Sequence, residues 1–381
     1  MNLAYLSQVS TYSPFSSRAH AYQITSRLSK KGVNIVTLRH DENPNFAKVE
    51  RNRDDIIKTL EKCDAIYVRA DISLEEFLLP ILRNIKKTVF WEVNSSTEEI
   101  LWIIKLSRKR FLSRYYFKES LKERIRLLKK NAIRKEFARY VDLAFCISEP
   151  LEQYVRDVYG VARTALVPNG SDPELFKPNH RDRSVFRADP DDILIVWAGS
   201  FEYPWHDKQR ILKVVREAKT SFPKWKFIFL AYPELLPPDL PDNVIFKKIV
   251  PYQGLSRYLA SCDIGFLLYR GIHFQRLGNY FSPLKLYDYL ACGLPVVVSD
   301  SGPQSGGVVK KFNCGILVDD SYESIINAII QLAEAPEKRK QLGENGRRAI
   351  ESYYNWERAA SNTFDAMCSL IDRPLKLRRS S

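Results

Sequence analysis

The sequence has few of the features that mark secreted, metal-binding or membrane-spanning proteins. Its six cysteines are spread over 381 residues without a C-x-x-C pair, so their spacing supports neither a zinc site nor a disulfide framework. No apolar run approaches the length of a membrane-spanning helix, and the N-terminus lacks the basic and then apolar segments of a signal peptide. The motif G-x-G-x-x-G is also missing, which argues against a dinucleotide-dependent dehydrogenase. These absences predict a cytoplasmic protein without a bound metal or cofactor.

The composition is that of a globular protein, with 45% hydrophobic and 27% charged residues. A chain of 381 residues is too long for one ordinary hydrophobic core, so we expect two domains. The first half opens with an apolar run at 2–8, an amphipathic stretch at 20–31 and a second apolar run at 34–38. This order predicts a doubly wound α/β domain, and the second half repeats it from residue 193 onward.

Turn residues predict the border between the domains. The segment PNGSDPELFKP, which follows Val167, combines Pro with Asn-Gly and suits a hinge. Residues 180–192 are charged and have no hydrophobic period, so we interpret them as the linker. The predicted domains cover residues 1–180 and 181–355, and residues 356–381 form a final helix with a basic tail.

The most informative stretch of the chain covers residues 278–307. Ser282 suits an N-cap, Pro283 suits the first position of a helix, and Gly293 would end that helix. The β-branched run 296–298 is typical of a parallel strand that is covered on both faces. The loop that follows would lie at the carboxyl edge of the sheet, where open α/β sheets bind ligands.

Lys285 stands in the first turn of this predicted helix, where the macrodipole disfavours a cation by roughly 0.3–1 kcal/mol. A phosphate would remove this penalty, because free backbone N–H groups at a helix start bind phosphates readily. Asp288 lies three residues later, within reach of a sugar hydroxyl. These positions predict a nucleotide-diphosphate site, with Lys285 and the amides of Ser282 and Leu284 on phosphate and Asp288 on ribose. An equal alternative is an i,i+3 pair of Lys285 with Asp288 on a solvated face.

The segment SPLKLYDYLACGLPVVVSD resembles the nucleotide-binding signature of family-4 (group 1) glycosyltransferases of the GT-B fold. The resemblance implies two doubly wound, Rossmann-like domains that face a central cleft, with the C-terminal helix crossing back to the first domain. It also implies that Asp288 contacts ribose. The family often has an acidic pair in this segment, and its first position falls on Tyr280, so the sugar contact of that residue is not predicted here.

The resemblance implies further donor contacts in the loop after the strand that begins at residue 193. Gly199 would let the backbone approach a phosphate. The position of the family's arginine falls on Ser200 or Phe201. Lys208 is then the remaining cation for the diphosphate, with His206 behind it, although an ordinary helix-surface lysine is an equal alternative.

Three other residues are candidate ligand contacts. Tyr252 falls where the family holds the base and could stack on it, or could be a buried aromatic. His20 follows a serine-rich loop at 13–17 and could contact the acceptor, although a plain first-turn histidine is the more common case. Asn94 follows a predicted strand at 88–93, at a place where the family often has a histidine on the acceptor side.

The net charge of +14 is concentrated in one segment. Residues 105–139 hold 14 Lys and Arg and three Glu, a local charge of +11, with aromatic residues interleaved at 115–117. A basic helical stretch of this kind suits an anionic membrane surface, nucleic acid or an acidic substrate. A solvated surface helix without a partner is an equal alternative.

Together these features predict a glycosyltransferase of the hexosyltransferase type, which moves a sugar from a nucleotide-diphosphate sugar to a glycan or lipid-linked acceptor. The resemblance implies retention of anomeric configuration, no metal ion, and a role in surface polysaccharide or glycoconjugate synthesis. Lys285, Lys208 and Asn94 are the expected catalytic residues. We expect no nucleic acid partner, and a peripheral position on the inner face of the membrane through residues 105–139. The alternatives are a GT-B nucleotide-sugar epimerase or phosphorylase, or a basic membrane- or nucleic-acid-binding module.

Overall fold

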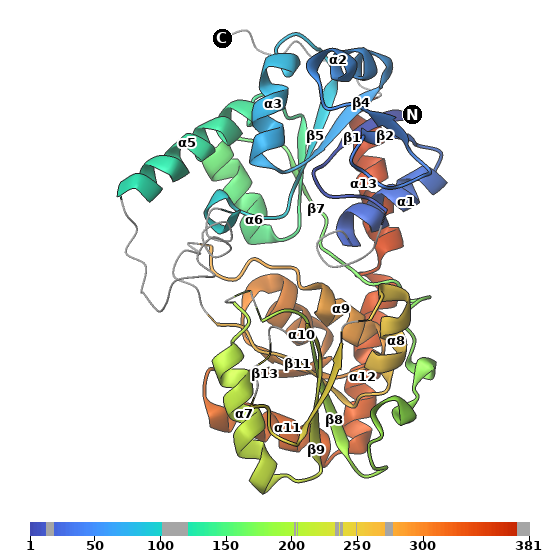
Figure 1. Cartoon of the computed structure of the whole chain (residues 1–381), viewed down its shortest axis with the longest axis vertical. Helices are drawn as coiled ribbons and strands as arrows, with labels where there is room; N and C mark the ends of the chain where they lie inside the picture. Colours follow the sequence, from blue (N-terminus) through green and yellow to red (C-terminus); the bar gives the residue numbers. More distant parts are fainter. Residues whose placement is uncertain are drawn as a thin grey trace. The chain divides into compact units, whose positions relative to one another are not determined.

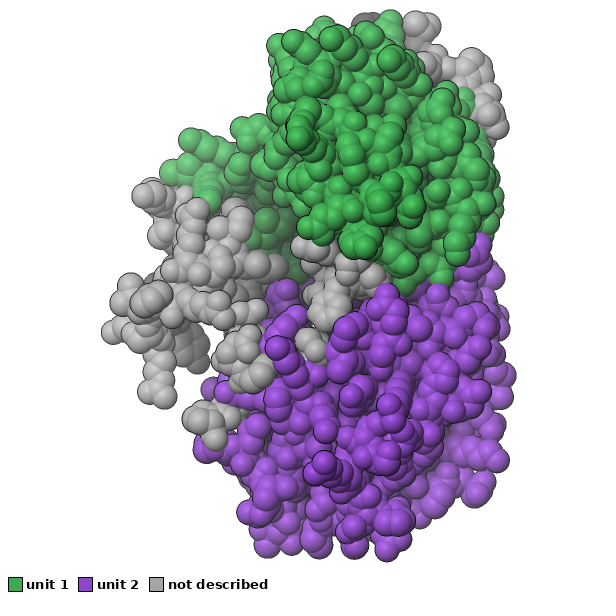
Figure 2. All heavy atoms as spheres, turned by 45° about the vertical axis from the view of Figure 1, so that its right-hand side comes forward, with its two compact units in different colours: residues 1–168, 274–277, 359–381 green, residues 169–273, 278–358 purple. Residues whose placement is uncertain are grey.

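The chain folds into two compact units (Figure 2). Unit 1 comprises Met1–Pro168, Phe274–Leu277 and Ala359–Ser381, and unit 2 comprises Asn169–His273 and Gly278–Arg358. The computed structural model describes residues 1–12, 19–100, 121–201, 203, 205–232, 236, 239–248, 250–270 and 277–371, with only the backbone described at 121–123.

Unit 1 is built on a seven-stranded parallel sheet with the order β3-β2-β1-β4-β5-β6-β7 (Figure 1). Its strands are β1 (Asn2–Leu6), β2 (Asn34–Leu38), β3 (Ala47–Val49), β4 (Ala65–Arg69), β5 (Thr88–Val93), β6 (Leu143–Cys146) and β7 (Thr164–Leu166). Its helices are α1 (Ala19–Lys30), α2 (Arg53–Lys62), α3 (Ile72–Leu82), α5 (Leu121–Ala138) and α6 (Glu149–Tyr154), which continues as the π-helix η2 (Val155–Tyr159).

Unit 2 is built on a six-stranded parallel sheet with the order β10-β9-β8-β11-β12-β13. Its strands are β8 (Ile193–Ala198), β9 (Trp225–Ala231), β10 (Val244–Lys248), β11 (Ile264–Leu267), β12 (Val296–Ser299) and β13 (Gly315–Val318). The helices are α7 (Lys208–Ser221), α8 (Tyr252–Ala260), α9 (Leu284–Ala291), α10 (Gly307–Phe312), α11 (Tyr322–Ala333) and α12 (Pro336–Ser352), with short helical turns η3 (Pro178–His180), η4 (Arg183–Phe186) and η6 (Gly302–Gly306). The last helix, α13 (Trp356–Ile371), begins in unit 2 and continues in unit 1 from Ala359.

Both sheets are the doubly wound kind that the sequence predicts. All residues of β5 and of β12 are buried, so each of these strands is covered on both faces, as parallel strands usually are. In each sheet the first strand of the unit lies in the interior and not at an edge. In unit 1 this strand is β1, between β2 and β4, and in unit 2 it is β8, between β9 and β11. The order in which successive strands are added to the sheet therefore reverses beside β1 and beside β8, and ligands bind at such switch points.

The segment 180–192 is not a free linker, which corrects the prediction. Phe186 is buried in η4, and Arg181 and Arg183 both form ion pairs with Asp263 of unit 2. The segment shows no hydrophobic period because its charged side chains bind to a distant residue of unit 2, and not because it is free of contacts.

The structure also divides the chain earlier than the predicted border at residue 180, since Asn169 and the residues after it belong to unit 2. Asn169 hydrogen-bonds to Ser282, and Ser171 donates to Asp288. The turn-rich segment that was read as a hinge is therefore packed against α9.

The basic segment is described only in part, because residues 105–120 lie outside the described chain. Its remainder forms α5, whose C-terminal half is attached to unit 1 by a buried ion pair between Arg134 Nε and Glu75 Oε2, 3.1 Å apart. Trp91 Nε1 donates to the other oxygen of Glu75 at 3.1 Å, and the Arg134 guanidinium lies over the Trp91 ring. The N-terminal end of α5 extends outward (Figure 1). None of the described helices has the length and apolar character that crossing a membrane requires.

The buried pair gives a stability prediction. Glu75→Gln leaves the Arg134 charge buried without its counter-charge, so the free energy of unfolding should fall by about 3–5 kcal/mol. The double variant Glu75→Leu with Arg134→Met removes both charges and should recover most of that loss. Urea unfolding followed by tryptophan fluorescence measures both. A single variant as stable as the parent, or a double variant no more stable than the single one, would contradict the prediction.

Candidate functional site

The donor-side residues gather at the carboxyl edge of the sheet of unit 2, beside β8. Gly199 directly follows β8, and His206 forms an isolated antiparallel bridge with Tyr269, which follows β11. The N-terminal turn of α9 brings Lys285 to the same place. The structure thus brings Lys285 to the switch point beside Gly199 and His206, although His206 precedes it by 79 residues in the chain.

The ammonium group of Lys285 points to this edge and not to solvent. Its Nζ lies 4.5 Å from the centre of the Trp197 ring and 3.3 Å from His206 Nε2. Burial lowers the pKa of Lys285 to about 7. Among the described residues no carboxylate forms an ion pair with it.

His206 is held as a neutral imidazole. Its Nδ1 lies 2.6 Å from the carbonyl oxygen of Ser200, which can only accept, so Nδ1 carries the proton. The other nitrogen, Nε2, then accepts a hydrogen bond from Lys285. Burial and the charge of Lys285 lower the pKa of His206 well below 6.5, which agrees with this assignment.

Gly199 is favoured by its backbone conformation and lies beside the Lys285 side chain. The residue has φ 144°, which L side chains rarely adopt, and a Cβ atom would lie 2.5 Å from Lys285 Nζ. The sequence predicted a close approach of the backbone to a phosphate, whereas the structure shows a close approach to the ammonium group that would bind it.

The start of α9 differs from the prediction in one respect. The helix begins at Leu284 with Pro283 as N-cap residue, and no side chain caps it. Ser282 is therefore not the helix cap. Its hydroxyl accepts a hydrogen bond from the backbone N–H of Asn169 at 2.9 Å and lies 3.0 Å from the Tyr287 hydroxyl. The Ser282 side chain, which the local sequence predicts as the helix cap, instead forms a tertiary hydrogen bond with Asn169. Gly293 ends the helix in the left-handed region, with φ 72°, as predicted.

Asp288 has different partners from Lys285. Its Oδ1 accepts from the Ser171 hydroxyl at 2.6 Å and from the Tyr252 hydroxyl at 3.5 Å, and burial raises the pKa of Asp288 to about 7. The alternative in which Lys285 and Asp288 pair on a solvated face is therefore wrong. Tyr252 is buried and its ring contacts Phe176 edge-on.

Lys208 is joined to the site through aromatic rings. It is the first residue of α7, and its Nζ lies 5.7 Å from the centre of the Phe201 ring. Phe201 stacks on Trp197 with ring centres 3.8 Å apart, and Trp197 in turn contacts Lys285. Sequence reasoning missed Trp197, because an aromatic residue in a buried strand reads as core.

The acceptor-side candidates His20 and Asn94 also meet in the structure, on a residue that was not predicted as a site. Glu92, inside β5, lies 3.0 Å from His20 Nδ1 and accepts from Asn94 Nδ2 at 2.7 Å. Arg69, the last residue of β4, forms an ion pair with the same carboxylate. A charged residue within the otherwise apolar strand TVFWEV was the sequence signal for this cluster.

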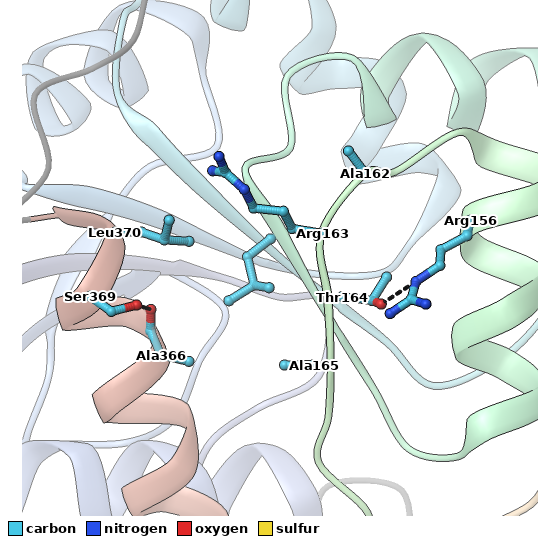
Figure 3. A pocket seen from close by; sticks show the side chains of 9 residues that line it. Arg156, Ala162, Arg163, Thr164, Ala165, Ala366, Ser369 and Leu370 are labelled. Atoms are coloured by element: carbon cyan, nitrogen blue, oxygen red, sulfur yellow. Dashed lines mark hydrogen bonds between the residues drawn. The ribbon is translucent and has the colours of Figure 1, made fainter.

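A cavity of about 380 Å³ in unit 1 contains none of the predicted site residues (Figure 3). It lies between the edge strand β7 and α13, and Arg156 Nε donates to Thr164 Oγ1 at its rim at 2.7 Å. Its lining residues are Leu143, Arg156, Ala162, Arg163, Thr164, Ala165, Ala366, Ser369 and Leu370. Among the described residues no group of three His, Cys, Asp or Glu is placed to hold a metal ion.

Comparison with curated proteins gives remote relatives. The putative teichuronic acid biosynthesis glycosyltransferase TuaH of Bacillus subtilis (strain 168) is 27% identical over 240 residues, which cover 60% of this chain and 54% of that protein. A GDP-mannose-dependent monoacylated alpha-(1-6)-phosphatidylinositol monomannoside mannosyltransferase of Corynebacterium glutamicum is 24% identical over 233 residues, covering 57% and 59%. The chain therefore spans little more than half the length of the curated relatives that it matches.

Solved structures show the fold over almost the whole chain. HepE of Anabaena in complex with UDP has a TM-score of 0.73 at 13% identity, covering 97% of this chain and 100% of that one. WaaG, a glycosyltransferase involved in lipopolysaccharide biosynthesis, has a TM-score of 0.65 at 13% identity, covering 95% and 99%. With two Rossmann-like units, the fold is GT-B.

The family comparison falls on the unit that holds Lys285. Residues 235–349 match the family model described as "Glycosyl transferases group 1". The matched range includes the whole of α9 and β12 and lies within unit 2 apart from residues 274–277. Unit 2 therefore contains a segment that is similar to the group 1 glycosyltransferase family.

Proposed function

We propose that this protein transfers a sugar from a nucleotide-diphosphate sugar to a glycan or lipid-linked acceptor. The observation that carries the proposal is the ammonium group of Lys285. It is held against the carboxyl edge of the sheet at the start of α9 and has no carboxylate partner among the described residues. The first turn of α9 has no side-chain cap, so its backbone N–H groups are available, and the Lys285 ammonium adds a positive charge. Such an arrangement suits an anionic diphosphate.

The diphosphate would bind to Lys285 and to the first-turn amide of Leu284, with Lys208 as a second cation. As the glycosidic bond to the donor breaks, negative charge develops on the departing diphosphate. The same groups would stabilise that charge, and holding the donor in one orientation would supply the rest of the rate enhancement. Asp288 and Tyr252, which already contact each other, would bind the ribose end of the nucleotide.

The product, the stereochemistry and the acceptor side of the reaction are proposed from the relatives and from unit 1. TuaH is named for teichuronic acid biosynthesis and the Corynebacterium relative for GDP-mannose and a phosphatidylinositol monomannoside. We infer a surface glycan or glycolipid as the product of this chain, retention of configuration as in the family, and no metal ion, because lysine and helix amides take its place on the diphosphate. His20 and Asn94 in unit 1 would face the acceptor.

We also propose that α5 docks on an anionic membrane surface. Leu128 and Ile125 are exposed by 68% and 46%, which is unusual for large apolar side chains. Exposed Arg124, Arg126 and Lys129 surround them on the same helix. Basic residues near an anionic surface contribute about 1 kcal/mol each, and apolar side chains add to this when they enter the interface.

Lys285→Met tests the donor site. The variant keeps the length of the side chain but removes the charge, so affinity for UDP or GDP and the turnover of the matching nucleotide sugar should each fall roughly 10- to 100-fold. Isothermal calorimetry and a product assay measure the two. Lys224→Met, at an exposed lysine of the same unit, is the matched control and should behave like the parent. Equal donor affinity in the two variants would contradict the assignment.

The same product assay separates the alternative reactions. A glycosyltransferase forms product only when an acceptor is supplied. An epimerase converts the nucleotide sugar without acceptor, and a phosphorylase consumes a free sugar phosphate. Either of the last two results would overturn the transfer reaction but leave the nucleotide site in place.

Donor binding should take up a proton above pH 7. The pKa of Lys285 is about 7 without ligand, and a bound diphosphate raises it because it favours the ammonium form. Affinity for UDP should therefore fall as pH rises above 7, by up to about tenfold per pH unit, until the raised pKa is passed. His206 stays neutral in this range, whereas Asp288 titrates near 7, so the experiment uses the Asp288→Asn background.

Calorimetry of UDP binding at pH 8, in HEPES and in Tris, gives the number of protons taken up from the difference in observed enthalpy. The uptake should disappear when Lys285→Met is added to the Asp288→Asn background. An uptake that is unchanged by Lys285→Met would assign the proton to another group and contradict this prediction.

Membrane docking is tested with vesicles. The intact protein should sediment with vesicles that contain phosphatidylglycerol and not with phosphatidylcholine vesicles. Ile125→Ser with Leu128→Ser should weaken this binding roughly tenfold. Tyr353→Ser removes a similarly exposed side chain from unit 2 and serves as control. Binding that is insensitive to the α5 changes, or to lipid charge, would contradict the proposal.

A further inference from the structure

Unit 1 has a polar cluster at its own switch point, beside β1, and Glu92 is its centre. The carboxylate has an exposed fraction of 1% and contacts five side chains. On Oε1 these are His20 Nδ1 at 3.0 Å, Asn94 Nδ2 at 2.7 Å, and the Arg69 guanidinium. On Oε2 they are the hydroxyl groups of Tyr5 at 3.2 Å and Tyr67 at 3.1 Å.

These contacts hold Glu92 in its ionised form. Burial by itself would raise the pKa of this carboxyl, but Arg69, His20 and the hydrogen bond from Asn94 lower the pKa overall. An ionised carboxylate can only accept hydrogen bonds. The four side chains that hydrogen-bond to Glu92, those of Tyr5, Tyr67, Arg69 and Asn94, therefore each direct a donor toward it.

The consequence is specific for Asn94. Its amide has two ends, and the Nδ2 end must face Glu92, so the Oδ1 end is turned away from the carboxylate. Oδ1 is buried and has no hydrogen-bond partner among the described residues. Leaving a buried carbonyl oxygen without a donor is unfavourable, and a ligand that supplies the donor would remove this cost.

We propose that Glu92 is a positioning residue that fixes the amide of Asn94, so that Asn94 Oδ1 accepts a hydrogen bond from a sugar hydroxyl. The switch point is where open α/β sheets bind ligands, and hydroxyl groups are the hydrogen-bond donors that a sugar ring carries on several of its carbons. This inference rests on the proposed glycosyl transfer for the identity of the ligand. The hydroxyl can come from the transferred sugar or from the acceptor.

The test compares Asn94→Ala and Glu92→Gln with the parent enzyme. Asn94→Ala removes the acceptor atom. Glu92→Gln removes the charge that fixes the amide, because a glutamine can face Asn94 with either end. Both should raise the KM for the sugar-bearing ligand about 5- to 20-fold and leave the affinity for UDP and GDP unchanged. Glu75→Gln, which changes another buried carboxylate of unit 1, is the control and should lower stability without changing KM.

Two arms identify the source of the hydroxyl. If it belongs to the transferred sugar, binding of UDP-glucose or GDP-mannose weakens in the variants while binding of the bare nucleotide does not. If it belongs to the acceptor, binding of the nucleotide sugar is unchanged and transfer to methyl α-glucoside or methyl α-mannoside requires a higher acceptor concentration. Either result supports the inference.

The outcomes that overturn it are distinct from those for the proposed function. Parent-like kinetics in Asn94→Ala would remove Asn94 as a ligand contact, while nucleotide binding by unit 2 would still stand. If Glu92→Gln does not fold, Glu92→Asp withdraws the carboxylate from Asn94 by one methylene and replaces it in the test. A parent KM in Glu92→Asp, with a raised KM in Asn94→Ala, would show that Glu92 does not position the amide.

Discussion

The proposed donor site depends on one contact, the hydrogen bond between the Lys285 ammonium and the neutral His206. The start of α9 and the low local polarity both disfavour a cation at this place. The Trp197 ring and the lone pair on His206 Nε2 partly offset this cost, and the Ser200 carbonyl keeps that lone pair available by holding the proton on Nδ1. Gly199 leaves the space that the ammonium group occupies. The charge is thus tolerated but not neutralised, which is the condition for binding an anion.

The two units share the strand order around their first strand but differ in the charge of the residue at the switch point, which is Lys285 in unit 2 and Glu92 in unit 1. Beside β8, a cation without a carboxylate partner among the described residues suits an anionic ligand. Beside β1, the Glu92 carboxylate is surrounded by donors, so it offers no charge to a ligand and instead sets the direction of its neighbours. A carbonyl oxygen that points away from such a centre selects a neutral hydrogen-bond donor. The partners of Lys285 and of Glu92 are thus the basis on which we propose a charged ligand for unit 2 and a hydroxyl-bearing ligand for unit 1.

The parts of the structure that sequence could predict are those that depend on local pattern. The strands at 34–38 and 88–93 have the predicted bounds and the final helix begins at the predicted residue 356, because their apolar pattern is strong. Lys285 was recognised because a cation in a first helical turn conflicts with a local rule. Contacts between distant segments were not predictable: Ser282 binds Asn169, 113 residues earlier, and not its own helix. For the same reason the charges of 180–192 were read as a linker, although their partner Asp263 lies elsewhere in the chain.

The pKa shifts at the donor site describe how ligand binding and stability are linked. Since the pKa of Lys285 is lowered to about 7 from its ordinary value near 10.5, the unfolded chain binds more protons than the native one between these pH values. This residue therefore costs stability below pH 7, and the cost declines as pH rises toward 10.5. A diphosphate that stabilises the ammonium form of Lys285 removes this cost, and the free energy so recovered contributes to the affinity for the diphosphate. Asp288 has the opposite dependence, since its pKa is raised to about 7 and its cost grows as pH rises from about 4 to 7. The ligand-free site is thus destabilised near neutral pH by both of its charged groups, and a nucleotide that meets one with phosphate and the other with ribose would relieve both.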